Sequence, residues 1–448
     1  MKNIFFPLGG GDEIGASSYY LQLDGTRLLL DCGLRPQGKR VYPDFDLLYA
    51  AGYCDGLWEL DSAFISHGHL DHCGALPKLV EEAPNLPIYT ATPGKQLIKL
   101  LLDDTVRIST DRSDGNRDFN LQLFNALTVE RGIGAVAEKK WGEAVDTGAC
   151  RVTFFPAGHI LGASMIYIEA ESVKVLFTGD YSHYKQFTVP AYSIPEDLEV
   201  DVLITETTYG YRNVYDRETV FDERLNFAHQ LEEIISVGGS VLIPAFAVGR
   251  SQELALLVRE LMLQRVLPSF PVYIDGMAKA ACDLYENNDI EIFTGEVQKA
   301  PAQLIKNLDY FNGLVISSSG MLAEGSLSAR YAERILPRAK NALFFTGYLD
   351  EESPGGRLGR LRENAGSSFR LHGKNVAVRA AVHSYRLSAH TDSSGIFQLV
   401  EKLQPKKVVF VHGYPRYGGK VNILNDAFAK YGNKVQFIQS SNGVPVYL

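Results

Sequence analysis

The stretch Ser66-His67-Gly68-His69-Leu70-Asp71-His72 decides how this chain is interpreted, because it places four potential metal ligands within six residues. The apolar residues before it, 62–65, are typical of a buried strand end, and residues 74–80 begin a helical pattern. The ligands are therefore expected at a strand-to-helix turn. Imidazoles and carboxylates packed this closely, without thiolates, favour an open catalytic zinc site over a closed structural one.

The composition is that of a packed globular protein. A length of 448 residues with 46% hydrophobic and 22% charged residues predicts two or three domains. The net charge of -9 argues against a protein that coats nucleic acid non-specifically, although it leaves room for a local basic cleft.

Five scattered cysteines without a C-x-x-C pair predict free thiols in a reducing compartment, and we expect the cytoplasm. We expect neither a signal peptide nor insertion into a membrane, because no apolar run is long enough.

Residues 19–30 predict a β-hairpin that ends in Asp31. Two apolar runs flank a turn at Asp24-Gly25, and the second run leads directly into the carboxylate. An unpaired carboxylate at a buried strand end would be costly, so we expect Asp31 to accept a bond from a ligand imidazole. The glycines at 9–11 and 15 lack the G-x-G-x-x-G spacing, which disfavours a dinucleotide-binding loop.

Four later strands also end in side chains that can bind metal or exchange protons. They deliver His159, Asp180, Glu206 and His412, after apolar runs at 150–156, 174–177, 200–205 and 407–411. A single histidine after a strand means little alone. The recurrence of the arrangement, together with the first stretch, favours one shared site.

Residues from about 209 to 385 alternate between strand and helix patterns and predict a separate α/β domain with a mostly parallel sheet. Two loops after its strands contain Gly249 and Arg250, and Ser319 and Gly320. Small residues before a helix N-terminus form a natural phosphate seat, to which Arg250 can add a bidentate contact. Plain tight turns remain the alternative interpretation of both loops.

The residues described above make the sequence resemble the metallo-β-lactamase-fold hydrolases, and within them the β-CASP nucleases. The resemblance covers nearly the whole chain. Residues 244–253 and 388–392 look especially like the cleavage-and-polyadenylation type of endonuclease and its bacterial and archaeal relatives. The motifs of these families match residue types at ten positions, which are Asp31, His67, His69, Asp71, His72, His159, Asp180, Glu206, His390 and His412.

The resemblance implies an α/β fold, a metallo-β-lactamase αββα sandwich with an inserted β-CASP domain. We expect residues 1–208 and 386–448 to form the sandwich and residues 209–385 to form the insert. The chain ends at Leu448, so we expect it to lack the C-terminal domains that J-type ribonucleases use for assembly. A homo-oligomer is compatible with the sequence.

The resemblance also implies two zinc ions and cleavage of single-stranded RNA by a two-metal mechanism. One ion would be held by His67, His69 and His159, the other by Asp71, His72 and His412, with Asp180 bridging them. His390 would protonate the leaving oxygen, and Glu206 would orient its imidazole. We count Asp71 with His390 and Glu206 among the catalytic residues. Asp31 would support the ligands from behind.

The chain departs from the family pattern at two places. Relatives often continue after the last histidine as H-G-E, whereas Gly413 is followed here by Tyr414-Pro415-Arg416. The fourth motif, residues 179–184, is unusually aromatic. Its rings could stack on a base or pack in the core, and packing is favoured.

Three other functions remain as alternatives. A small-molecule thioesterase or lactonase of the same fold has no reason to carry the inserted domain. An inactive metal-binding scaffold is disfavoured by the intact ligand positions, and a DNA-processing relative by His412, where such proteins typically have valine. The resemblance leaves open whether cleavage is endonucleolytic or 5′ exonucleolytic.

Overall fold

The structure is a computed structural model that describes residues 2–35, 40–110, 124–210, 217–347, 349–361, 368–417, 420–421 and 424–448. It divides into two compact units. Unit 1 comprises Met1–Lys185, Val189–Val214 and His390–Leu448, and unit 2 comprises Gln186–Thr188 and Tyr215–Ala389. The domain boundaries expected from the sequence, 1–208, 209–385 and 386–448, remain a proposal.

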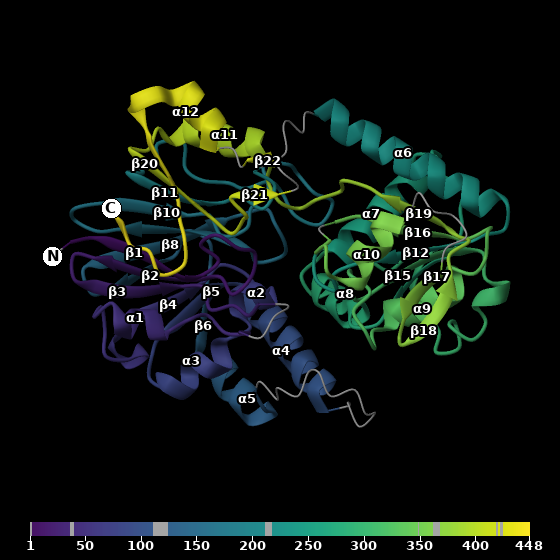
Figure 1. Cartoon of the computed structure of the whole chain (residues 1–448), viewed down its shortest axis with the longest axis horizontal. Coiled ribbons are helices and arrows are strands. Elements are labelled where there is room, and N and C mark those ends of the chain that lie inside the picture. The colour runs from purple at the N-terminus through teal and green to yellow at the C-terminus, as the bar shows by residue number, and fades with distance from the viewer. Residues whose placement is uncertain are drawn as a thin grey trace. The chain divides into compact units, whose positions relative to one another are not determined.

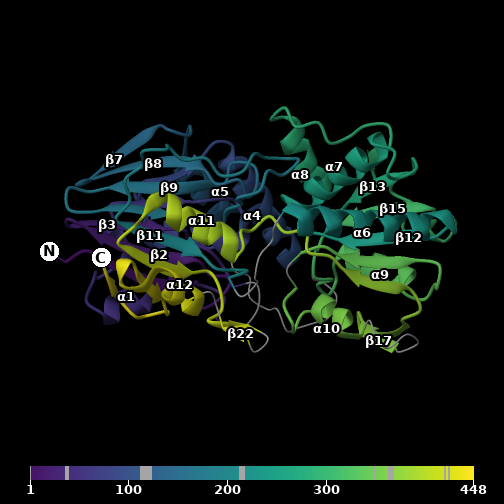
Figure 2. The ribbon, with the colours of Figure 1, turned by 90° about the horizontal axis from the view of Figure 1, so that it is seen from above.

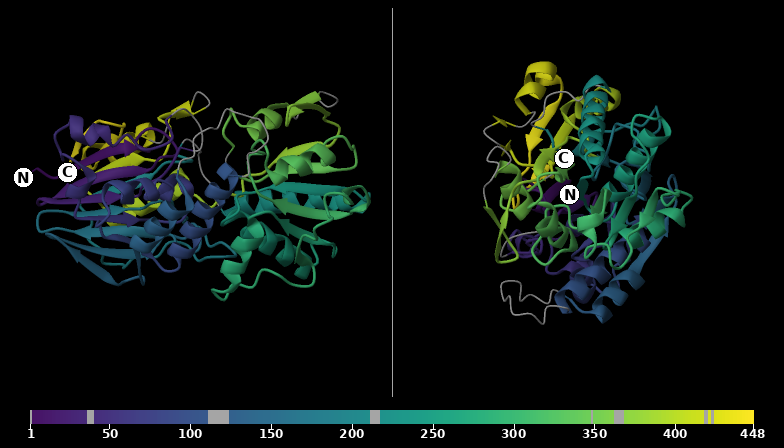
Figure 3. Two further views of the ribbon diagram at one scale, coloured as in Figure 1. Left: turned by 90° about the horizontal axis from the view of Figure 1, so that it is seen from below. Right: turned by 90° about the vertical axis from the view of Figure 1, so that its right-hand side faces the viewer.

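Unit 1 contains two seven-stranded sheets. The first has the order β24-β1-β2-β3-β4-β5-β6, in which the last strand of the chain pairs with the first. Both chain ends therefore lie beside one another on this sheet, as Figure 3 also shows. Its strands are β1 Ile4–Gly9, β2 Ser18–Leu23, β3 Thr26–Leu30, β4 Ser62–Ile65, β5 Ile88–Ala91, β6 Val136–Lys139 and β24 Val446–Tyr447.

The second sheet has the order β23-β20-β11-β10-β9-β8-β7. It joins segments that are distant in the chain, because β20 enters between β11 and β23. The central strands are apolar and almost fully buried, as expected for a sheet covered on both faces. Its strands are β7 Ala144–Thr147, β8 Cys150–Pro156, β9 Ser164–Glu169, β10 Lys174–Phe177, β11 Val202–Glu206, β20 Lys407–Val411 and β23 Gln436–Gln439.

Helices cover the outer faces of the two sheets, which gives the expected four-layer αββα order (Figure 1). One apolar core lies between the sheets and a second lies between the first sheet and its helices. The helices are α1 Asp46–Ala50, α2 Leu70–Cys73, α3 Leu76–Glu82, α4 Gly94–Thr110 and α5 Ala126–Ala135 on the first sheet, and α11 Ser393–Leu403 and α12 Leu424–Tyr431 on the second. The fold class predicted from the sequence is confirmed.

Strand direction brings the predicted site residues to one edge of unit 1. β3 and β4 are parallel, and β10, β11 and β20 are parallel. Parallel strands present their carboxyl ends at the same edge of a sheet. β3 and β20 end immediately before Asp31 and His412, and β11 ends at Glu206. β4 ends two residues before His67, and β10 ends three residues before Asp180.

Unit 2 is built on a six-stranded parallel sheet of order β14-β13-β15-β12-β16-β19. Figure 2 shows α7 and α8 on one side of this sheet and α9 on the other. The strands are β12 Ser240–Pro244, β13 Val272–Asp275, β14 Val297–Lys299, β15 Gly313–Ser317, β16 Ala342–Phe345 and β19 Ala381–Ser384, with a separate hairpin of β17 Ser368–Leu371 and β18 Lys374–Ala377. The helices are α6 Arg217–Ser236, α7 Arg250–Leu263, α8 Ala278–Glu286, α9 Leu327–Ile335 and α10 Pro354–Arg360.

Residues 186–188 belong to unit 2 because a buried carboxylate holds them there. Glu253 on α7 accepts the backbone N–H groups of Phe187 and Thr188 at 2.9 and 3.0 Å, and the Thr188 hydroxyl at 3.1 Å. The sequence pattern did not indicate this contact. In the part of the chain that the structure describes, no helix combines the length and apolarity needed to cross a membrane.

Candidate metal centre and catalytic site

The H-x-H-x-D-H stretch spans the tight turn after β4 and the single-turn helix α2, which contains Asp71 and His72. His69 is the N-cap of α2, and its backbone carbonyl accepts the N–H groups of His72 and Cys73. The turn packs so closely on the β3 end that a Cβ added at Gly33 would lie 1.7 Å from the backbone oxygen of Asp71. Glycine at position 33 therefore allows the two ligand-bearing segments to meet.

Three histidines and one carboxylate form the first ligand cluster. His67 Nε2 and His159 Nε2 lie 3.1 and 3.3 Å from His69 Nδ1, and each lies 3.7 Å from Asp180 Oδ2. Ring nitrogens of three histidines that converge on one carboxylate oxygen are arranged as ligands around a small volume. The set is appropriate for zinc, which imidazole and carboxylate groups bind well.

Asp71, His72 and His412 form a second cluster beside the first. His412 Nε2 lies 3.4 Å from Asp71 Oδ2, and His72 Nε2 lies 3.9 Å from the same oxygen. Asp180 faces this cluster too, with Oδ2 3.4 Å from His72 Nε2 and Oδ1 3.1 Å from His412 Nδ1. Asp180 thus stands between the two clusters, where a bridging ligand would stand.

Asp31 lies behind His72, on the side away from Asp71 and Asp180. Its Oδ2 is 2.8 Å from His72 Nδ1, while its two oxygens accept the Ser66 backbone N–H at 2.7 Å and the Ser66 hydroxyl at 2.9 Å. A carboxylate that accepts the Nδ1 proton fixes the tautomer in which the Nε2 lone pair is available to a metal. This geometry suits the supporting role expected for Asp31.

Several atoms of the clusters are buried without a hydrogen bond. These atoms are Nε2 of His72, Nε2 of His412 and Oδ1 of Asp180. Buried polar atoms normally have a partner, because an unsatisfied one costs about 1–3 kcal/mol. Here imidazole nitrogens and carboxylate oxygens face one another at distances of 3–4 Å, so cations between them would satisfy the orphaned atoms. The residues therefore fit a pair of bound metal ions.

His390 and Glu206 form a pair next to the ligand clusters. Glu206 is buried at the end of β11, and its Oε2 lies 3.0 Å from His390 Nδ1. Its other oxygen accepts the Tyr181 backbone N–H at 2.8 Å. His390 Nδ1 is also 3.7 Å from Asp180 Oδ2, so the pair adjoins the position between the clusters. The His390 side chain is 18% exposed, which leaves it accessible to a substrate.

Burial and opposite charge shift the pKa values within the site in different directions. Burial lowers the pKa of the His67 imidazole well below its usual range, and His72 lowers it further. Burial also lowers the pKa of His390, but the carboxylates of Glu206 and Asp180 raise it by more. For Asp180, burial raises the pKa, but the facing imidazoles of His412 and His72 bring it well below its usual range. The central carboxylate is therefore ionised, as a metal ligand must be.

Two site residues have left-handed backbone conformations, with φ of +58° at Asp31 and +48° at His412. Non-glycine residues adopt this region at a cost of roughly 1–2 kcal/mol, and such strain gathers at functional sites. At position 412 the backbone N–H also donates to the Gly10 carbonyl at 2.6 Å. The strained turns point both side chains back toward the clusters, which no sequence pattern indicated.

The aromatic fourth motif is mostly packed inside unit 1. Tyr181 is completely buried, and the His183 ring contacts the Tyr184 ring at a tilt of 42°, with centroids 3.7 Å apart. Tyr181 is therefore not available to stack on a base. His183 instead contacts Thr391, next to His390. No sequence pattern indicated a contact between His183 and Thr391, and the only signal in this region was the unusual aromatic content of residues 179–184.

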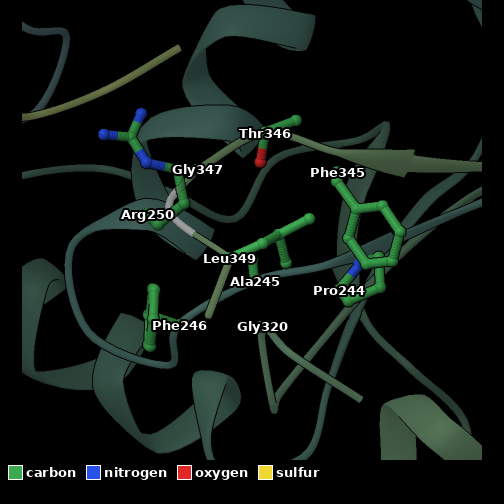
Figure 4. A pocket seen from close by; sticks show the side chains of 9 residues that line it. All are labelled: Pro244, Ala245, Phe246, Arg250, Gly320, Phe345, Thr346, Gly347 and Leu349. Atoms are coloured by element: carbon green, nitrogen blue, oxygen red, sulfur yellow. The ribbon is translucent and has the colours of Figure 1, made fainter. Parts of the chain in front are cut away.

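The four residues predicted to contact phosphate lie at the carboxyl edge of the unit 2 sheet. Gly249 is the N-cap of α7, and Ser319 and Gly320 follow β15. A small, open pocket at this edge is lined by Arg250 and Gly320, with Thr346 and apolar residues (Figure 4). The Thr346 hydroxyl is buried without a hydrogen bond. These loops remain a predicted phosphate site.

Comparison with known proteins identifies matching families along most of the chain. Residues 11–216 match the metallo-beta-lactamase superfamily, residues 251–358 the Beta-Casp domain, and residues 375–417 the "Zn-dependent metallo-hydrolase RNA specificity domain". A solved protein of unknown function from Enterococcus faecalis shares the fold, with a TM-score of 0.57 and 14% identity over 100% of both chains.

Three curated relatives illustrate the family. A ribonuclease of Thermus thermophilus is 31% identical, over 98% of this chain and 99% of its own length. Cleavage and polyadenylation specificity factor 73 of Drosophila melanogaster and endoribonuclease YSH1 of Saccharomyces cerevisiae are each 30% identical, over 91% and 99% of this chain. The chain spans only 59% of the length of each of these two eukaryotic relatives. This chain belongs to the β-CASP family of the metallo-β-lactamase superfamily, as shown by the domain matches and by the Thermus thermophilus relative, which it matches over 99% of that protein's length.

Proposed function

We propose that this chain is a zinc-dependent ribonuclease that hydrolyses phosphodiester bonds of single-stranded RNA. The observation that carries the proposal is the convergence of ten residues from distant parts of the chain on one edge of unit 1, including two ligand clusters that share Asp180. Two of the relatives, from Saccharomyces cerevisiae and Thermus thermophilus, are named as ribonucleases, which supports the choice of RNA as substrate. A cluster built only to hold a structural metal would not need the adjoining pair of His390 and Glu206.

His67, His69 and His159 would hold one zinc ion, and Asp71, His72 and His412 the other, with Asp180 shared between them. Bound there, two zinc ions would supply Lewis acidity, lowering the pKa of water and neutralising charge on the phosphate. Asp31 holds the His72 ring in the orientation that this role needs, since it accepts the Nδ1 proton.

His390 has the position of a general acid. Because Glu206 accepts the Nδ1 proton, the proton that His390 can give to a substrate is the one on Nε2. The two carboxylates near the ring raise its pKa, which favours the protonated form needed at the start of the reaction. His390 would protonate the leaving oxygen, and Glu206 would stabilise the resulting tautomer.

The recessed site favours a flexible strand over a duplex. Of the proposed ligands, His67, His72, His159, Asp180 and His412 are all buried, so a phosphodiester must enter the site to react. A single strand can bend into such a site at lower cost than a stacked double helix. Gly249, Arg250, Ser319 and Gly320 would contact other phosphates of the strand, with Arg250 contributing charge.

A competition assay tests the substrate class. Labelled single-stranded RNA is incubated with the zinc-loaded protein, alongside matched single-stranded DNA, duplex RNA, a chromogenic lactam and a thioester. We expect single-stranded RNA to be cut much faster than the others. Efficient turnover of the lactam or thioester without cleavage of RNA would overturn the proposal. Preferential cutting of single-stranded DNA would show that DNA, and not RNA, is the substrate.

The cleavage mode is decided by labelling the two RNA ends separately. A 5′ exonuclease releases a labelled mononucleotide from 5′-labelled RNA as its first product, whereas an endonuclease releases longer fragments from either label. The contribution of Arg250 is measured in the same substrate. Arg250→Ala should reduce the slope of log affinity against log salt by about 1, the value for one lost phosphate contact.

A further inference from the structure

The loop after β10 is bonded to the segment that carries His390. The Thr391 backbone N–H donates to the Tyr181 carbonyl at 2.7 Å, and the Thr391 hydroxyl lies 2.9 Å from His183 Nδ1. These residues are separated by about half the chain. Thr391 thus has both a backbone and a side-chain attachment to this loop.

The contact between His183 and Thr391 is enclosed by α11. The His183 side chain is only 6% exposed. A Cβ added at Gly395 would lie 2.2 Å from His183 Nδ1 and 2.2 Å from Thr391 Oγ1, so the helix can pack here only because residue 395 is glycine. The close approach of three segments indicates a defined contact and not a loose surface pair.

Asp392 completes the same arrangement at the start of α11. Its Oδ1 accepts the backbone N–H groups of Ser394 and Gly395 as a helix N-cap, and its Oδ2 is 3.4 Å from the Tyr184 hydroxyl. The residue also forms a β-bridge with Tyr209. The loop at 181–184 and the N-terminus of α11 therefore fix the direction in which the chain leaves His390.

His390 is the first residue of the segment that returns to unit 1. Its ring is held by Glu206, and Glu206 also accepts the Tyr181 backbone N–H. Tyr181 is thus bonded on one side to the carboxylate that orients the His390 ring and on the other to the residue that follows His390. The attachment of residue 391 determines where the His390 backbone lies relative to Glu206.

We propose that His183 is a positioning residue for His390: its imidazole anchors Thr391 and thereby holds the His390 ring against Glu206. The side chain is too buried to reach a substrate. Burial lowers its pKa, so the ring is neutral at pH 7 and can share a hydrogen bond with a hydroxyl without bringing a second charge to the site. The kinetic part of this inference rests on the ribonuclease function proposed above.

Two variants of His183 distinguish the loss of its hydrogen bond to Thr391 from a simple loss of packing. His183→Leu keeps a side chain of similar bulk without a hydrogen-bonding nitrogen, whereas His183→Asn places an amide near the position of Nδ1. The matched control is His229→Leu, a change at an exposed residue of α6. Thr391→Val removes the partner hydroxyl with little change in shape. Zinc content and thermal unfolding are measured for each variant before any rate.

We expect His183→Leu to lower kcat about tenfold with KM and zinc content unchanged, and His183→Asn to recover much of the loss. The decisive comparison uses His390→Ala. If His183 acts through His390, adding His183→Leu to His390→Ala should cause no further loss, and Thr391→Val should not add to His183→Leu. A substrate with a better leaving group should be spared, because it needs less help from an acid.

Hydrogen exchange provides a test that needs no substrate. The amide of Thr391 should exchange faster in His183→Leu than in the wild type and in His229→Leu, while amides of β12 in unit 2 should not change. Unchanged exchange at Thr391 would overturn the claim that His183 holds Thr391 in place. An equal loss of kcat with and without His390, or loss of zinc, would overturn the positioning role. If the wild-type protein does not cut RNA, the proposed function fails, while the exchange result still decides the anchor.

Discussion

Asp180 faces both ligand clusters. Its Oδ2 lies 3.7 Å from His67 Nε2 and 3.4 Å from His72 Nε2. We therefore expect purified protein to hold close to two zinc ions per chain and Asp180→Ala to hold fewer than one, with loss of activity. Metal analysis of both proteins measures this, with the exposed Asp197→Ala as the control. Unchanged zinc in Asp180→Ala would contradict the shared-ligand assignment.

His390→Ala should lose activity but keep its zinc, whereas Asp180→Ala should lose both. The residue is bonded to Glu206 and is outside both histidine-rich clusters, so zinc should be retained. Cleavage should fall roughly a hundredfold or more, the usual contribution of a general acid. Rates measured on RNA and on a substrate with a better leaving group should differ, with the second partly spared. Zinc loss in this variant would make His390 a ligand instead.

At the scale of residues, the sequence indicated the candidate site residues but not most of the contacts that hold them in place. His67, His69, Asp71 and His72 are close in the chain, and their spacing alone indicates metal binding. The contact of His183 with Thr391 joins residues 208 positions apart, and no local pattern reveals such a pair. Nor does a sequence show that Asp31 and His412 adopt left-handed backbone angles, because those angles arise from packing after the strands end.

At the scale of elements, the strand ends position the site, and Gly33 is the point where two of them meet. A methyl group at position 33 would overlap the Asp71 carbonyl at 1.7 Å, so Gly33→Ala should displace α2, lower zinc content and reduce thermal stability. Gly134→Ala in α5 is the control, since nothing lies within 4 Å of its added Cβ. That change should be neutral or stabilise by about 0.5–1 kcal/mol. Equal zinc content in both variants would refute this account of the turn.

The strands that the sequence predicted well are apolar and almost wholly buried. The apolar runs at 62–65 and 407–411 coincide with β4 and β20, because continuous apolar residues are typical of covered strands. The attachment of residues 186–188 to unit 2 was missed, since it depends on the buried carboxylate of Glu253. The hairpin of β17 and β18 was also missed, because each strand is only four residues long and much of it is exposed, which leaves too short a pattern to indicate a strand.

At the scale of the whole molecule, all proposed zinc ligands lie in unit 1, whereas unit 2 has its own apolar core. Removing zinc with a chelator should therefore destabilise unit 1 selectively. Zinc at 100 times its dissociation constant contributes about 2.7 kcal/mol to the free energy of unfolding. Hydrogen exchange should rise in β10, β11 and β20 after chelation, with little change in β12 and β15. An equal rise in both units would indicate that they unfold together.

Unit 1 is assembled from both ends of the chain, and this has a consequence for its synthesis on the ribosome. β20 enters the second sheet between β11 and β23, and β24 pairs with β1. A nascent chain that ends before residue 407 has neither β20 nor the proposed ligand His412 that follows it. If the chain is the ribonuclease proposed above, the growing polypeptide would be unable to cut the message from which it is translated until this region has been synthesised.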